Sequence, residues 1–133
     1  METHKNLKME TTYFWVVSQM DTIPSIDGLV DVVSVIHWRR NAVAVDGDNT
    51  YFADVYGSMG CSTPSETDFT AYPDLTFEQV CSWLDAGLDV EALNANLDAQ
   101  IENQINPPII VLPNPWPTPT IEQEIVAGDQ PIV

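Results

Sequence analysis

The placement of proline most constrains the fold of this chain. Seven of its ten prolines follow residue 106, beginning with the pair Pro107-Pro108. Proline lacks a backbone donor and keeps the preceding residue out of the helical conformation, so a helix or a central strand cannot run through this segment. We therefore expect the folded part to end near residue 106. Residues 107–133 should form an extended, stiff arm close to polyproline II.

The length and hydrophobic content bound the remaining possibilities. The chain has 133 residues, of which 44% are hydrophobic. This length suits one domain of about 100 residues plus an arm, which excludes a large multidomain enzyme. The hydrophobic fraction is ordinary for a folded domain and argues against full disorder.

Charge is distributed unevenly along the chain. The formal net charge is −16, and the four cations are Lys5, Lys8, Arg39 and Arg40. Residues 41–133 contain fifteen acidic residues and no Lys or Arg. Their carboxylates must face water, small cations or a basic partner. We expect no direct binding of nucleic acid, because neutralising phosphates requires clustered Lys and Arg. An acidic surface adapted to a saline setting explains the charge equally well.

Signals for membranes and metals are absent from the sequence. The first ten residues are polar, and no run approaches the ~20 apolar residues of a membrane helix, so we expect no membrane contact. Cys61 and Cys81 match no metal-binding spacing. We expect reduced thiols, with Cys81 buried in a helix, and a single disulfide between them is the alternative.

Residues 12–73 read as an antiparallel β-domain with a linker, after a flexible terminus over 1–11. Strands are expected over residues 12–20, 29–40 with a continuation to 45, and 50–57. The middle strand is apolar on both faces, so it should be central and covered on both sides for part of its length. Turns are expected at 24–28 and 46–49, and Gly57 and Gly60 suggest a bulge or a sharp exit.

Residues 74–106 read as a helical hairpin. Thr76 and Gln79 have the spacing of a capping box, and Gly87 stands where a left-handed residue usually closes a helix. Asp89 is a suitable N-cap for a second helix to about Ile105. One apolar stripe on each helix must bury against the sheet or a neighbour. The expected fold class is α+β: a small N-terminal antiparallel β-sheet domain, a helical hairpin and an extended Pro-rich C-terminal arm.

The sequence contains no catalytic signature. His37 lies in mid-strand, where a structural role is the usual one, and no Ser or Cys nucleophile has an assignable base. The segment Asp46-Gly47-Asp48-Asn49 is rich in oxygen ligands but lacks the order of a calcium loop, so a hairpin turn is expected. We predict that the chain is not an enzyme and has no catalytic residue, no metal site and no cofactor.

The arm carries the best candidates for partner binding. It is apolar where a solvated linker would be polar, and Trp116 stands between Pro115 and Pro117. A stiff segment that presents one large aromatic side chain is typical of an anchor for a docking groove. Packing back on its own domain is the alternative. The candidate residues in the arm are Ile109, Ile110, Val111, Leu112, Trp116 and Ile121.

Arg39 and Arg40 are the remaining candidates. They form the only basic pair in an acidic chain. Either they are a solvated strand end paired with Asp46 or Asp48, or they contact an acidic patch of an identical neighbour, which would favour self-assembly. Trp15, Trp38 and Trp83 fall in strands and on a helix stripe, so core packing is expected for all three.

The order of several short motifs resembles that of small uncharacterised proteins of tailed bacteriophages, notably marine and cyanobacterial phages. The resemblance covers residues 12–116. It is carried by Val35-Ile36-His37-Trp38-Arg39, Asp46-Gly47, Val55-Tyr56-Gly57, Leu75-Thr76-Phe77-Glu78-Gln79-Val80 with Trp83, Gln104-Ile105-Asn106-Pro107-Pro108, and Leu112-Pro113 ahead of Trp116. The resemblance implies a phage origin and a small virion-associated or assembly protein, with no activity or site attached.

The expected function is therefore that of a virion structural protein, assembled in the host cytoplasm. A capsid decoration or cement protein comes first, because a small β-domain with an arm can bridge capsid subunits. A tail, connector or fibre-attachment component comes next. The expected partners are other virion proteins, either the major capsid protein or tail and connector subunits, with homo-oligomers on the particle. The alternatives are an acidic DNA-mimic effector and an assembly chaperone inside the host cell.

Overall fold

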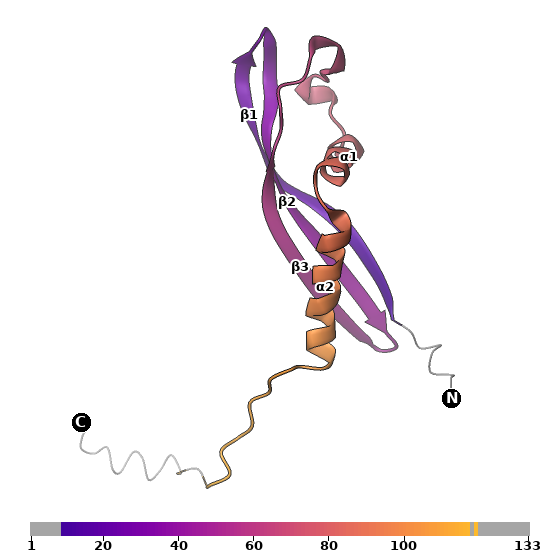
Figure 1. Cartoon of the computed structure of the whole chain (residues 1–133), viewed down its shortest axis with the longest axis vertical. Coiled ribbons are helices and arrows are strands. Elements are labelled where there is room, and N and C mark those ends of the chain that lie inside the picture. The colour runs from indigo at the N-terminus through magenta and orange to yellow at the C-terminus, as the bar shows by residue number, and fades with distance from the viewer. Residues whose placement is uncertain (1–8, 118, 120–133) are drawn as a thin grey trace, which may run out of the picture.

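The fold is a three-stranded antiparallel sheet with two helices on one of its faces (Figure 1). The computed structural model describes residues 9–117 and 119. The strands are β1 (Glu10–Ile26), β2 (Leu29–Asp46) and β3 (Asn49–Gly60), in the spatial order β1-β2-β3. Two short 3₁₀ turns follow, η2 (Glu66–Asp68) and η3 (Tyr72–Asp74), and then the helices α1 (Phe77–Gly87) and α2 (Val90–Ile105). The predicted α+β class with an N-terminal sheet is confirmed.

Two-residue turns connect the strands. Asp27 and Gly28, with φ of 53° and 82°, join β1 to β2, and Gly47, with φ of 63°, lies in the turn between β2 and β3. Asp27 and Gly28 both have positive φ, whereas in the second turn Gly47 alone does, and both arrangements match the right-handed twist of the strands. The turn predicted at 46–49 is confirmed.

The first strand is longer than the sequence predicted. It begins at Glu10 and continues through Pro24 to Ile26, whereas a strand over 12–20 was expected. Because β1 is an edge strand, the missing N–H of Pro24 can point away from the ladder. Ile23 pairs with Val32 and Ser25 pairs with Val30, so proline sits between two ladder pairs without breaking the strand.

The core lies between the sheet and the helices and has two parts. Trp15 and Trp38 pack edge to face, with ring centroids 5.6 Å apart, beneath α1. Under α2 the buried apolar side chains of the sheet are all small, which lets the helix lie close to the strands. These are Ala42, Ala44 and Ala53, packed against Leu97 and Ile101. The predicted core positions of Trp15 and Trp38 are confirmed, and Trp83 is half-buried.

The opposite face of the sheet is not covered within the described residues. Alternate residues of β2 from Val35 to Val45 point to it and are half-buried or exposed. Phe52 and Tyr56 of β3 also belong to this face, and 64% and 73% of their surface is accessible. The middle strand is central, as expected, but coverage on both sides is not found from Val35 to Val45; within β2 the consecutive residues Val32 and Val33 are both buried. We call this surface the open face of the sheet.

Both helices begin at the predicted caps. The Thr76 hydroxyl accepts the Gln79 backbone N–H at 3.1 Å, and the Asp89 carboxylate accepts the Ala92 backbone N–H at 3.1 Å. The capping box at the first helix is incomplete, because the Gln79 side chain donates to the Thr70 hydroxyl instead. The buried residues of α1 are Val80 and Leu84 and those of α2 are Leu97 and Ile101, whereas Phe77 at the start of α1 is exposed. Figure 1 shows α2 running along the strands.

Two glycines have roles that the sequence did not indicate. Gly57 causes no bulge, because the β2–β3 register is unbroken from Val35↔Gly60 to Asp46↔Asn49. A Cβ at Gly57 would instead meet Cζ2 of Trp38 at 2.8 Å. Gly87 ends α1 as predicted but is not left-handed, and Sδ of Met59 occupies the place of its missing side chain. Close approach of a neighbouring side chain explains both glycines.

Candidate functional site

The described part of the arm is extended and exposed. It leaves the end of α2 and points away from the sheet (Figure 1). Ile109 is 83% accessible, Val111 93% and Trp116 64%, and Ile110 and Leu112 are similarly exposed. In the structure, residues 109–116 therefore do not pack back on their own domain, which was the alternative. Ile121 lies outside the described residues.

Arg39 lies on the open face and is engaged within the sheet. Its guanidinium pairs with the Asp54 carboxylate of β3 and lies 5.0 Å from the centroid of the Tyr56 ring. The predicted pairing with Asp46 or Asp48 is wrong, because the register places Asp54 diagonally across from Arg39. That Arg39 contacts an acidic patch of an identical neighbour stays a prediction.

Arg40 points to the other face and is buried, with 9% of its surface accessible. Its guanidinium lies 4.5 Å from the Trp15 ring centroid, and its Nε donates to the Asn94 side chain of α2 at 3.1 Å. This arrangement ties the helix to the sheet through a cation–π contact and a hydrogen bond. The expectation that Arg40 contacts an acidic patch of a neighbour is therefore wrong.

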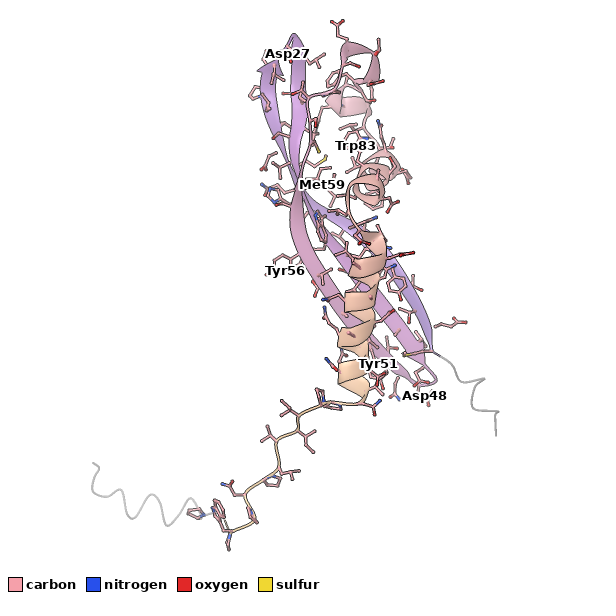
Figure 2. The ribbon with its side chains drawn as sticks, in the orientation of Figure 1. Asp27, Asp48, Tyr51, Tyr56, Met59 and Trp83 are labelled. Carbon is pink, nitrogen blue, oxygen red and sulfur yellow. The ribbon has the colours of Figure 1, made fainter. Side chains whose placement is uncertain are left out.

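A cavity of about 510 Å³ lies between α1, the linker and the β1–β2 end of the sheet. In Figure 2, Met59 of β3 and Trp83 of α1 mark two of its walls. Most of the lining is apolar, and two carboxylates, Asp31 and Asp68, are among the polar groups that complete it. The main apolar contributors are Val32, Val33, Met59, Phe69, Leu75 and Trp83.

Sequence reasoning missed this cavity because its walls come from separate segments. β2, β3, the linker and α1 each supply only a few residues. The one local signal was Phe69, a large apolar residue inside the otherwise polar linker 62–73. A second, smaller hollow of about 410 Å³ lies on the open face beside Phe14 and Phe52.

Within residues 9–117, the titratable side chains of interest are one His–Asp pair and two thiols. Nε2 of His37 lies 3.0 Å from the Asp21 carboxylate, whose pKa is lowered by hydrogen bonds from Gln19 and then from His37. Burial raises the pKa of the Cys61 and Cys81 thiols, and the nearby carboxylates of α1 add to this at Cys81. Both cysteines are free, so they are protonated and poor nucleophiles at neutral pH.

Over residues 9–117, no group of three or more His, Cys, Asp or Glu side chains is placed to hold a metal ion. Neither of the helices that the structure describes is long and apolar enough to cross a membrane.

Comparison with known proteins gives a family without an assigned activity. Searches of curated proteins and of solved structures returned no match. One family model, described as a domain of unknown function, matches residues 10–116, from the first residue of β1 to the exposed tryptophan of the arm. The chain therefore belongs to the DUF7936 family of domains of unknown function.

Proposed function

We propose that this chain is a non-enzymatic structural protein of a phage virion, in the first place a capsid decoration or cement protein, which binds neighbouring subunits through its arm. The observation that carries the proposal is the run of exposed apolar side chains from Ile109 to Trp116. Contiguous apolar surface of this kind marks interaction sites, because water makes it costly to leave uncovered.

The energetics of the arm suit binding to another protein. Full burial of one large apolar side chain contributes about 1.5–3 kcal/mol. Five such residues lie within eight positions, from Ile109 to Trp116. The prolines restrict the free arm, which lowers the entropy lost when it is immobilised on a partner. A short segment of this composition is therefore sufficient to anchor the domain.

The distribution of charge favours the arm, rather than the folded body of sheet, linker and helices, as the surface that contacts a partner. Residues 107–119 contain no ionisable side chain, whereas most of the acidic residues belong to the sheet, the linker and the helices. Residues 107–119 can approach a neighbouring acidic copy without repulsion from charges of their own, while the acidic body suits an outer surface away from DNA. The family model also extends to residue 116, so the family unit includes the arm as far as Trp116, which supports a role for this part of the arm.

The placement in a virion rests on the sequence resemblance to phage proteins. The placement is tested by quantitative mass spectrometry, which measures the copy number of the chain in purified, nuclease-treated particles. A count comparable to that of the major capsid protein supports capsid decoration. About six or twelve copies, the size of one symmetric ring, would indicate a tail, connector or fibre-attachment component. Absence from the particle would refute the virion assignment and favour an effector or chaperone inside the host cell.

The role of the arm is tested on the same particles. A chain without residues 107–133 should keep the circular dichroism of the folded domain, since residues 107–117 contribute nothing to either core cluster. It should no longer associate with particles that lack the native protein. The matched control is Tyr56→Ser, which removes an exposed aromatic side chain from the open face and should leave association unchanged. Full association of the truncated chain would contradict the proposal.

A further inference from the structure

We infer that the cavity beneath α1 receives the Trp116 segment of a second copy of this chain, so that copies associate head to tail. The inference rests on the proposed function of the arm and names one partner for it. It joins two observations made on different parts of the molecule. One is an apolar cavity of about 510 Å³, and the other is an exposed tryptophan held between prolines.

The chemistry of the cavity fits a proline-rich segment. Extended proline-rich peptides dock into grooves lined by aromatic side chains, against which the flat faces of proline rings pack. Phe69 and Trp83 supply aromatic walls, and Met59 supplies a flexible thioether that adapts to the shape of a ligand. The cavity lies in the lower half of the ~300–1,000 Å³ range of ligand pockets, which suits an indole with a flanking proline ring.

The geometry favours a second copy over the same chain. The arm leaves the far end of α2, whereas the cavity lies at the α1 end of the sheet (Figure 1). The described arm points away from the cavity and is exposed along its length. A donor arm at one end and an acceptor cavity at the other make a heterologous contact, which builds rings or open chains.

Electrostatics favours the arm over the other segments of an identical neighbour as the segment that enters the cavity. Asp31 and Asp68 line the cavity, and an acidic segment of a second copy would be repelled there. Between Pro107 and Pro119 the arm has no ionisable side chain. Within residues 9–117, the stretch from Pro107 onward combines exposed apolar side chains with the absence of charge.

The first test is self-association of the purified full chain, measured by sedimentation velocity over a wide concentration range. The weight-average mass should rise with concentration. Trp116→Ala should weaken association by about tenfold or more, as expected for a tryptophan anchor. Tyr56→Ala is the matched control, because it also removes an exposed aromatic side chain, from the open face. It should associate like the unmodified chain.

The second test mixes two variants that are each defective at one end. Ala86 is exposed on α1 and lines the cavity, so Ala86→Phe should fill the acceptor without disturbing the core. Trp116→Ala removes the donor anchor and keeps the cavity. At a concentration where the unmodified chain begins to associate, each variant alone should stay monomeric, with the circular dichroism of the unmodified chain. A mixture should give one-to-one dimers, because one chain keeps a working arm and the other a working cavity.

Several results would overturn the inference. Self-association of Ala86→Phe alone would place the contact outside the cavity. Loss of self-association in Tyr56→Ala would place the contact on the open face. A mass that stays monomeric at every concentration would exclude a second copy as the partner. If the truncated chain has meanwhile lost its association with particles, the proposed function stands and only the identity of the partner is wrong. Self-association without particle association would support the inference and refute the proposed function.

Discussion

The contact between Gly57 and Trp38 allows a quantitative prediction. Trp38 is the direct cross-strand partner of Gly57, and both face the helices. Replacing Gly57 with alanine places a Cβ 2.8 Å from Cζ2 of the indole, whereas carbon atoms pack best at about 3.5–4.0 Å. The ring cannot retreat easily, because it is buried and packed edge to face on Trp15.

Two opposing terms set the size of the effect. Overpacking of a well-packed core costs about 1–3 kcal/mol. Alanine is favoured over glycine in a strand interior by about 0.5–1 kcal/mol, since glycine loses more backbone entropy on folding. The expected net loss for Gly57→Ala is about 1–2 kcal/mol. For a domain of this size that loss lowers the midpoint of thermal unfolding by about 5–15 °C.

Gly87→Ala is the matched control for this reasoning. Its Cβ would also collide with a side chain, but the atom it meets is Sδ of Met59. Met59 borders the cavity, so the flexible thioether has room to move. The helix propensity of alanine offsets the cost, and the net change should be within about 0.5 kcal/mol.

Thermal and urea unfolding, followed by circular dichroism, measure both variants. The expected order of stability places Gly57→Ala clearly below Gly87→Ala and the unmodified chain. Equal or greater stability of Gly57→Ala would refute the argument that the indole of Trp38 dictates glycine at this position. A large loss in Gly87→Ala would show that Met59 is more tightly held than the cavity implies.

Three further predictions concern the helices. Asp98→Asn should bring the pKa of Tyr13 down from about 12 toward 10, in an absorbance titration, because the Asp98 carboxylate accepts the phenol hydrogen bond at 2.5 Å. That bond stabilises the folded state fully below pH 10, and its contribution should disappear between pH 10 and 12. Asp89→Ala should cost about 1 kcal/mol in urea unfolding, and Asp89→Asn, which keeps the cap, much less. Leu97→Ala, at a fully buried site, should cost about 2–5 kcal/mol.

Local features of the fold could be predicted because their physical causes lie within a few residues. The caps at Thr76 and Asp89 depend on a hydrogen bond three positions along the chain. The turn at Gly47 depends on its own backbone conformation. The end of the folded part depends on Pro107 and its neighbour. In each case the sequence window that predicts the feature also contains the atoms that form it.

Other features could not be predicted, because their causes lie far apart in the chain. Pro24 was expected to end a strand and instead lies within one, since only the sheet order makes β1 an edge. Arg39 and Arg40 are adjacent, yet the pleat sends one to the open face and the other into the core. The partner of Arg39 followed from the register of β3, which places Asp54 within its reach.

The candidate site divides in the same way. The sequence alone determined the arm, because its prolines, its apolar side chains and the absence of ionisable groups from residues 107–119 are properties of one continuous segment. Only the tertiary structure decided that this segment leaves the domain exposed, and only it created the cavity, whose walls come from two strands, the linker and α1. The physical reason is that a segment carries its own stiffness and polarity, whereas a cavity exists only where separate segments pack together.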